Sequence, residues 1–111
     1  MNYILEYRKN ILFIKINGEI TNKTIYSINI ELDNLINNLC IYNIVFNFEE
    51  VTYIDESSVQ CLKNWNDLIR KRKGVNYICS LSEIIKKTNI LNYIYEISNE
   101  LCAMRVINWN N

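Results

Sequence analysis

Histidine and proline are absent from the sequence, and its 111 residues include a single alanine and two glycines. Without histidine, the chain cannot carry imidazole acid–base chemistry, a Ser-His-Asp or Cys-His catalytic arrangement, or a zinc site with histidine ligands. An excess of charge is also lacking, because 12 Lys and Arg balance 12 Asp and Glu. Affinity for a phosphate backbone comes mainly from excess cations that release counterions, so this balance argues against a nucleic-acid partner.

Long apolar runs are missing as well. No segment approaches the ~18 apolar residues that a membrane helix requires, which predicts no membrane insertion. The first residues have neither the basic start, the apolar stretch nor the cleavage site of a signal peptide. We therefore expect a soluble, cytoplasmic protein. No C-x-x-C pair is present, and we interpret the four cysteines as buried, reduced and structural: Cys40, Cys61, Cys79 and Cys102.

The sequence does contain enough apolar material for a core. Half of its residues are hydrophobic and 22% are charged, a balance that is typical of globular proteins. No linker, internal repeat or low-complexity tract interrupts the chain. Length and composition together predict one domain over residues 1–111.

Hydrophobic periodicity predicts alternating strands and helices. Two segments rich in Ile, Tyr and Phe, Tyr3–Arg8 and Ile11–Asn17, are separated by Lys9 and Asn10 and predict a hairpin. Apolar positions spaced three and four residues apart predict an amphipathic helix over Thr24–Cys40. The later expected elements are a buried strand at Ile44–Phe48, a helix at Ser57–Lys73, a strand at Val75–Ser80, a helix capped at Ser80 and a short edge strand at Ile94–Ile97. Ser98–Ile107 forms either a last helix or another strand, and we favour a helix capped by Ser98.

This order of elements predicts the fold class. Right-handed crossovers make strand pairs parallel when a helix connects them, and only the opening hairpin lacks such a helix. We therefore expect an α/β fold with a mixed, mostly parallel sheet of about four to five strands and about four helices packed on it.

A basic run, Arg70-Lys71-Arg72-Lys73, ends the second predicted helix and precedes Gly74. Such a run suggests a nucleic-acid surface. Cations are also favoured at the negative end of a helix dipole, however, and glycine commonly follows a helix end. We favour this second interpretation, in which the run is a solvated helix terminus.

Carboxylates and hydroxyls crowd the segment Glu49–Gln60, which joins the predicted buried strand to the second helix. In an α/β sheet, ligands and partners most often meet such loops at the carboxyl ends of strands. By spacing alone, Ser57 and Gln60 form a Ser-x-x-Gln capping box, and this local role is favoured. Four carboxylates offer oxygen ligands for Mg²⁺ but lack a second convergent group, so a solvated acidic loop is preferred: Glu49, Glu50, Asp55 and Glu56.

Three parts of the chain resemble STAS domains, the family shared by bacterial anti-sigma factor antagonists and sulfate-transporter tails. Asn17-Gly18-Glu19-Ile20 is similar to the Gly-Glu-Leu signature after the family's second strand. The segment Phe46–Val59 is similar, without a gap, to the antagonists' strand and loop that end in an Asp-Ser-Ser-Gly-Leu signature. Gly74–Ser80 and the helix after it match the family's fourth strand and third helix. The resemblance covers nearly the whole chain and implies a STAS-like fold.

The resemblance also implies a phosphorylation site. Asp55 falls on the signature's Asp, and Ser57 on its second Ser, the residue that antagonists present for phosphorylation. Glu56 stands where the family usually has the first Ser, Ser58 where it has Gly, and Gln60 where a second Gly is frequent. A side chain in place of Gly can obstruct a kinase or alter the turn, and Ser58 is an alternative acceptor. The expected partner-binding residues are Asp55, Glu56, Ser57, Ser58 and Gln60.

The function that the resemblance implies is that of an anti-sigma factor antagonist in bacterial transcription regulation. The unphosphorylated protein would bind an anti-sigma factor serine kinase and so release a sigma factor. The phosphorylated protein would dissociate from the kinase. A serine phosphatase is a further expected partner. We expect no catalytic residue, metal or cofactor, and no enzymatic activity. The alternative is a non-phosphorylated STAS subunit of a lipid-transport ATPase or signalling assembly, which Ser58 and Gln60 in place of small residues favour.

Overall fold

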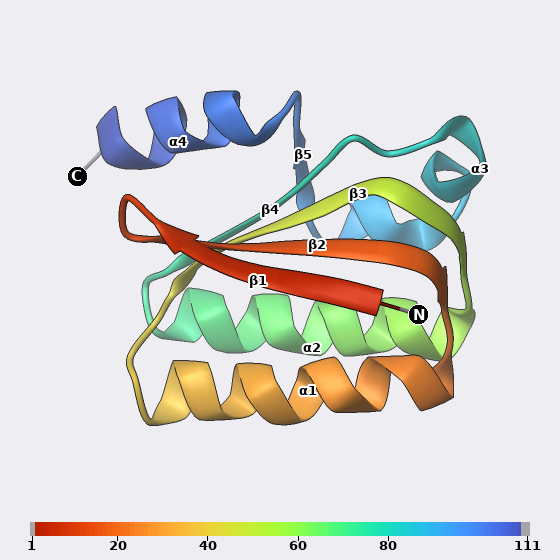
Figure 1. Ribbon diagram of the computed structural model, residues 1–111, viewed down its shortest axis with the longest axis horizontal. Coiled ribbons are helices and arrows are strands. Elements are labelled where there is room, and N and C mark those ends of the chain that lie inside the picture. The colour runs from red at the N-terminus through yellow and green to blue at the C-terminus, as the bar shows by residue number, and fades with distance from the viewer. Residues whose placement is uncertain (1, 110–111) are drawn as a thin grey trace.

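In the computed structural model, which describes residues 2–109, the chain begins with the predicted antiparallel hairpin (Figure 1). Lys9 and Asn10 form its turn, and both are in the left-handed region, with φ of 52° and 67°. Strands and helices then alternate as the periodicity predicts. Within the described residues the elements are β1 (Asn2–Arg8), β2 (Ile11–Ile20), α1 (Asn22–Asn37), β3 (Asn43–Ile54), α2 (Glu56–Lys71), β4 (Val75–Cys79), α3 (Glu83–Lys86), the 3₁₀ helix η1 (Asn89–Asn92), β5 (Tyr95–Ile97) and α4 (Glu100–Trp109).

The strands form a mixed sheet in the order β1-β2-β3-β4-β5. Strand β1 is antiparallel to β2, and the other neighbouring pairs are parallel. Helices α1 and α2 cover one face of the sheet and α4 covers the other (Figure 1). A large apolar core lies beneath α1 and α2 and includes Phe46 stacked on Trp65, whereas a smaller core beneath α4 includes Phe13 and Ala103. The predicted α/β class, with a mixed and mostly parallel sheet, is confirmed.

Strand β3 is longer than the buried apolar run that predicted it. The expected loop from Glu49 onward continues the strand as far as Ile54. It does so because β2 also continues, and the two strands remain paired up to Ile20 and Ile54. Val51 and Ile54 are buried in the core, while Thr52 and Tyr53 are exposed. This half of β3 is therefore partly exposed to solvent. The connection between β3 and α2 is reduced to a single residue.

Helix α2 ends in a Schellman motif. The Gly74 N–H donates to Ile69 O and the Lys73 N–H to Arg70 O, both at 2.9 Å, which are the two bonds that define the motif. The left-handed residue is Lys73, with φ of 61°, and not Gly74. Glycine is required at position 74 for another reason, because a Cβ there would lie 2.2 Å from Tyr42 O. The glycine that was predicted to stop the helix therefore permits a close approach of two backbones.

The C-terminal elements follow the predicted order but have different caps. Helix α3 is capped by Ser82, whose hydroxyl accepts a backbone N–H of the helix, and not by Ser80. Helix α4 is preceded by Asn99, whose Oδ1 accepts a backbone N–H at 2.8 Å, in place of the predicted Ser98. None of the helices within residues 2–109 has the length and apolar character needed to cross a membrane.

The four cysteines are free thiols with different exposure. Cys79 is buried, as predicted, and Cys61 and Cys102 are partly buried. Cys40 is exposed in the connection between α1 and β3, so the prediction that all four are buried is wrong for this residue. Helix α1 ends before it, at Asn37, which leaves Cys40 in a left-handed turn with φ of 56°.

Candidate functional site

The segment that resembles the antagonist signature lies where two neighbouring strands end and two helices begin. Ile20 and Ile54 are register partners in the parallel pair β2–β3, so the chain leaves the sheet twice at the same edge. Helices α1 and α2 start at Asn22 and Glu56, directly after these strand ends. The Asp55 N–H donates to Ile20 O at 3.1 Å. This hydrogen bond holds the β2–α1 junction next to the β3–α2 junction.

Gly18 shapes β2 just before this edge. Its φ of 98° is in the region that favours glycine. The pairing between β2 and β3 also shifts by one residue between Gly18 and Glu19, as at a β-bulge. The resemblance to the Gly-Glu-Leu signature therefore has a physical basis, since glycine permits the bulge that sets the direction in which β2 enters the α1 junction.

The carboxylate of Asp55 caps both helices. Its Oδ1 accepts the Ser58 N–H at 2.9 Å, which makes Asp55 the N-cap of α2. Its Oδ2 accepts the Asn22 N–H at 2.9 Å, in the first turn of α1. Burial raises the pKa of Asp55, but the hydrogen bonds that the carboxylate accepts outweigh this effect and the pKa is lowered. The ionised carboxylate thus stabilises the positive ends of two helix dipoles.

The two serines that follow Asp55 have opposite surroundings. Ser57 is exposed, and its Oγ donates to Asp55 Oδ1 at 3.3 Å. Ser58 is fully buried, and its Oγ, although beside the Asp55 carboxylate, has no hydrogen-bond partner of good geometry in the described residues. A kinase must reach the hydroxyl that it modifies, so this geometry favours Ser57 over Ser58. The Ser58 side chain also faces the core, which leaves the surface beside Ser57 unobstructed.

Glu56 and Gln60 flank Ser57 on the outer surface of α2, where both are exposed. Gln60 follows Ser57 by three residues and therefore lies on the same helix face. Its Nε2 donates to Asn64 Oδ1 at 3.2 Å, so the predicted capping box of Ser57 and Gln60 is wrong and Asp55 takes the capping role. One surface thus brings together Asp55, Glu56, Ser57 and Gln60, with Ser58 beneath it.

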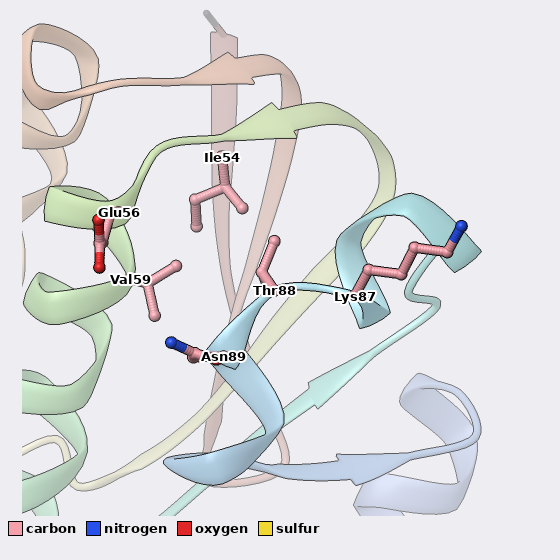
Figure 2. A pocket seen from close by; sticks show the side chains of 6 residues that line it. All are labelled: Ile54, Glu56, Val59, Lys87, Thr88 and Asn89. Carbon is pink, nitrogen blue, oxygen red and sulfur yellow. The ribbon is translucent and has the colours of Figure 1, made fainter.

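A cavity of about 280 Å³ opens beside this surface, between the start of α2 and the α3–η1 connection. Figure 2 shows Ile54 and Val59 directed toward Thr88 and Asn89, whereas the amino group of Lys87 extends away from them. Glu56 lies at the margin and is the residue that the cavity shares with the surface around Ser57. The walls are therefore apolar on the strand and helix side and polar on the η1 side.

Glu49 and Glu50 do not belong to this surface. They lie within β3, where Glu49 Oε2 is 3.9 Å from Lys15 Nζ and Glu50 Oε2 accepts from Asn17 Nδ2 at 3.1 Å. The acidic loop expected from the sequence is therefore divided between a strand and a helix start. Within residues 2–109, no group of three or more Asp, Glu or Cys side chains converges in a way that could hold a metal ion.

Two features of the site have no strong sequence signal. The bond from Asn22 to Asp55 joins residues 33 positions apart through a backbone donor, which leaves no pattern in the side chains. The wall formed by Thr88 and Asn89 comes from the point where α3 has ended and η1 begins, whereas apolar spacing predicts that the third helix continues through Thr88. A signal for the cap itself was present, because Asp is a preferred N-cap residue and Asp55 directly precedes the helix.

The strand order and the paired helix starts agree with the family that the sequence resembles. Residues 2–101 match the STAS domain family, and the chain belongs to that family. The resemblance noted in the sequence is confirmed. A comparison with curated protein sequences gives no match.

Several solved structures are similar to this chain, among them one of the anti-sigma factor antagonist SpoIIAA. SpoIIAA in its unphosphorylated form has 16% sequence identity and a TM-score of 0.79, with 98% of this chain and 97% of that chain covered. The phosphorylated form of the Bacillus cell fate determinant SpoIIAA has 18% identity and a TM-score of 0.77, with 95% and 99% covered. A variant of Moorella thermoacetica RsbS, in which a serine is replaced by glutamate, has 10% identity and a TM-score of 0.83, with 99% and 97% covered. At these identities the likeness shows the fold.

Proposed function

We propose that this protein is an anti-sigma factor antagonist whose association with a partner is controlled by phosphorylation of Ser57. The observation that carries the proposal is the exposed Ser57 hydroxyl at the start of α2, beside the Asp55 carboxylate. The similar structures include an antagonist in both unphosphorylated and phosphorylated forms, which supports the same kind of control. In this proposal the chain is a bacterial, cytoplasmic interaction module and has no catalytic role of its own.

The partner would be an anti-sigma factor serine kinase that binds the unmodified surface and thereby releases a sigma factor. Glu56 and Gln60 supply polar contacts around Ser57, and the adjacent cavity accepts an apolar side chain against Ile54 and Val59. The kinase would transfer the γ-phosphoryl group of ATP to Ser57 Oγ. The bond between the γ-phosphorus and the β–γ bridging oxygen breaks, ADP leaves, and the serine hydroxyl gives its proton to a base of the kinase. A serine phosphatase would restore the hydroxyl by hydrolysis.

Phosphate on Ser57 would act mainly on association. It adds about −1.5 to −2 charges at neutral pH, next to Asp55 and Glu56. A partner that covers this site must desolvate the dianion, which costs several kcal/mol unless a new cation compensates it. Each ~1.4 kcal/mol changes affinity tenfold, so modification is expected to weaken binding by two orders of magnitude or more.

Incubation with the cognate kinase and ATP, followed by mass spectrometry of the peptide that contains both serines, tests the proposal. We expect phosphate on Ser57, its loss in Ser57→Ala, and its retention in the matched variant Ser58→Ala. In a binding assay, Ser57→Ala should keep its affinity for the kinase and Ser57→Asp should lose at least about tenfold. An unmodified Ser57 under conditions in which the kinase is active would overturn the proposal.

The second candidate function is a STAS subunit without a phosphorylation switch, in a lipid-transport ATPase or a signalling assembly. Gln60 favours it, because this exposed side chain occupies a position where the antagonist pattern frequently has glycine. Purification from the native host distinguishes the two candidates. Recovery with a transport ATPase favours the subunit, and recovery with a serine kinase favours the antagonist.

A further inference from the structure

The end of the molecule opposite Ser57 is formed by three connections that are far apart in the sequence. They are the β1–β2 turn at residues 9–10, the α1–β3 connection at residues 38–42 and the α2–β4 turn at residues 72–74. All three lie at the left of Figure 1, whereas the starts of α1 and α2 lie at the right. The Asn43 Nδ2 donates to Asn10 O at 3.2 Å and the Val75 N–H to Tyr42 O at 3.1 Å, so the connections touch one another.

Positive charge is concentrated at this end. We call the residues Lys9, Arg70, Lys71, Arg72 and Lys73 the basic end; all five are exposed. None of them forms an ion pair with a carboxylate within residues 2–109. The three connections contain none of the 12 carboxylates, and the basic end holds five of the 12 cations, so the rest of this neutral chain carries a net charge of −5.

Apolar side chains project among these cations. Leu39, in the α1–β3 connection, is 60% exposed, and Tyr7, beside the hairpin turn, is 51% exposed. The guanidinium of Arg72 is held in place, because it lies 5.9 Å from the Tyr42 ring and donates to Asn37 Oδ1 at 2.8 Å. The end therefore combines exposed cations with an exposed leucine and an aromatic ring.

We propose that the basic end docks the protein on the surface of an anionic lipid bilayer, without insertion of a helix. Each Lys or Arg close to an anionic membrane contributes independently to binding, and exposed apolar or aromatic side chains pack at the headgroup level. A nucleic acid would use the cations equally well, and its bases can stack on an aromatic ring, but it offers no aliphatic region for Leu39. The combination of cations and an exposed leucine therefore favours lipid over nucleic acid.

The dimensions of the protein make this docking compatible with zero net charge. The molecule is 33 Å long, and its two ends lie along that axis (Figure 1). Electrostatic interactions are screened over about 10 Å at 0.1 M salt, so the carboxylates near Ser57 are not felt at the bilayer. In this orientation the Ser57 surface points away from the membrane and remains open to a partner. The inference is therefore independent of the proposed phosphorylation.

Vesicle co-sedimentation of the full chain tests the proposal. We expect binding to phosphatidylcholine vesicles that contain about a third phosphatidylglycerol, and none to phosphatidylcholine alone. Raising the salt from about 0.1 M to about 1 M should release the protein, because the screening length falls to about 3 Å. Lys71→Gln with Lys73→Gln should weaken binding by about 30-fold, and Leu39→Ser by about tenfold.

The matched control removes the same charge from the other end. Lys23 lies in the first turn of α1 and Lys87 directly after α3, and both are exposed. Lys23→Gln with Lys87→Gln should leave vesicle binding unchanged. Ser57→Asp should also leave it unchanged, whatever its effect on a kinase. Failure to bind anionic vesicles at 0.1 M salt, or an equal loss in the control pair, would overturn the proposal. Binding to a single-stranded oligonucleotide that depends on Lys71 and Lys73, without vesicle binding, would overturn it in favour of nucleic acid.

Discussion

Ser57 and Ser58 are adjacent in the chain but meet different environments, because consecutive residues of an α-helix point about 100° apart. The Ser57 hydroxyl faces solvent and the Asp55 carboxylate, whereas the Ser58 hydroxyl is sealed in the core without a partner of good geometry. A buried hydroxyl without a hydrogen bond costs about 1 to 3 kcal/mol. We therefore expect the buried Ser58 hydroxyl to cost stability, while it leaves the outer surface unchanged.

Removal of the Ser58 hydroxyl is expected to stabilise the protein. Ser58→Ala deletes the unpaired Oγ and keeps the Cβ, so the free energy of unfolding should rise by about 1 kcal/mol. Ser57→Ala is the matched control and should change it by less than about 0.5 kcal/mol, because Ser57 is exposed. Urea denaturation measures both variants. A loss of stability in Ser58→Ala would show that the buried hydroxyl has a partner.

Thiol modification should distinguish the cysteines. Cys40 is exposed, whereas Cys79 is buried and burial raises the pKa of its thiol. Only the thiolate reacts quickly, so an aromatic disulfide reagent should modify Cys40 first in the native protein and Cys79 only after unfolding. Absorbance of the released thiol follows the reaction, and Cys40→Ser should abolish the fast phase. A fast phase that persists in this variant would contradict the exposure of Cys40.

At the scale of elements, Asp55 connects two helices that the sequence presents as independent. Its carboxylate accepts one N–H at the start of α1 and one at the start of α2. An asparagine side chain in the same place has one acceptor oxygen and so can satisfy only one of these donors, and an alanine side chain has none. Asp55→Asn therefore removes one of the two caps, and Asp55→Ala removes both.

We expect Asp55→Asn to lower the free energy of unfolding by about 1 kcal/mol and Asp55→Ala by about 2 kcal/mol, one loss for each cap. The pKa of Asp55 is lowered in the folded state. Its contribution is therefore fully present above the unfolded value near 4 and is lost as the pH falls through the lower folded pKa. Unfolding measured from pH 7 to pH 2 should show a smaller acid-induced loss in Asp55→Asn than in the unmodified chain. An identical pH profile would contradict the shared cap.

The end of α2 permits a paired test of two neighbouring residues. Gly74→Ala places a Cβ against the Tyr42 backbone and should destabilise the protein by more than about 2 kcal/mol. Lys73→Gly removes a side chain from a left-handed residue and should stabilise it by about 0.5 to 1 kcal/mol. Thermal unfolding measures both changes. Equal effects of the two substitutions would contradict the assignment of their separate roles.

More of the fold than of the candidate site could be predicted from the sequence. Apolar periodicity gave the element order, because each helix face and each buried strand must match the core. Periodicity failed in the outer half of β3, where Glu49, Glu50 and Thr52 interrupt the apolar pattern and pairing with β2 maintains the strand. Local spacing likewise suggested that Ser57 caps α2, whereas Asp55 does so with a second bond to a residue 33 positions away. Contacts of that kind depend on the assembled sheet and leave no local pattern.

At the scale of the whole molecule, positive charge is concentrated at one end of the long axis. The three connections around the basic end contain no carboxylate, whereas Asp55 and Glu56 lie where α2 begins. Because the molecule is 33 Å long and screening reduces interactions over about 10 Å, the two ends can act on different partners. A phosphate on Ser57 would therefore leave the electrostatics of the other end nearly unchanged.

Phosphorylation of Ser57 is also expected to leave the fold intact. The phosphate gains about 0.3 to 1 kcal/mol from the positive end of α2, while a nearby carboxylate such as Glu56 opposes it by about 1 kcal/mol in water. Because Ser57 is exposed, the phosphate can also rotate away from Asp55 into solvent. The midpoint of urea unfolding should therefore shift by the equivalent of less than about 1 kcal/mol in the phosphorylated protein, and Ser57→Asp should behave in the same way. If modification instead unfolded the chain, loss of partner binding would reflect destabilisation, and control at the surface around Ser57 would be excluded.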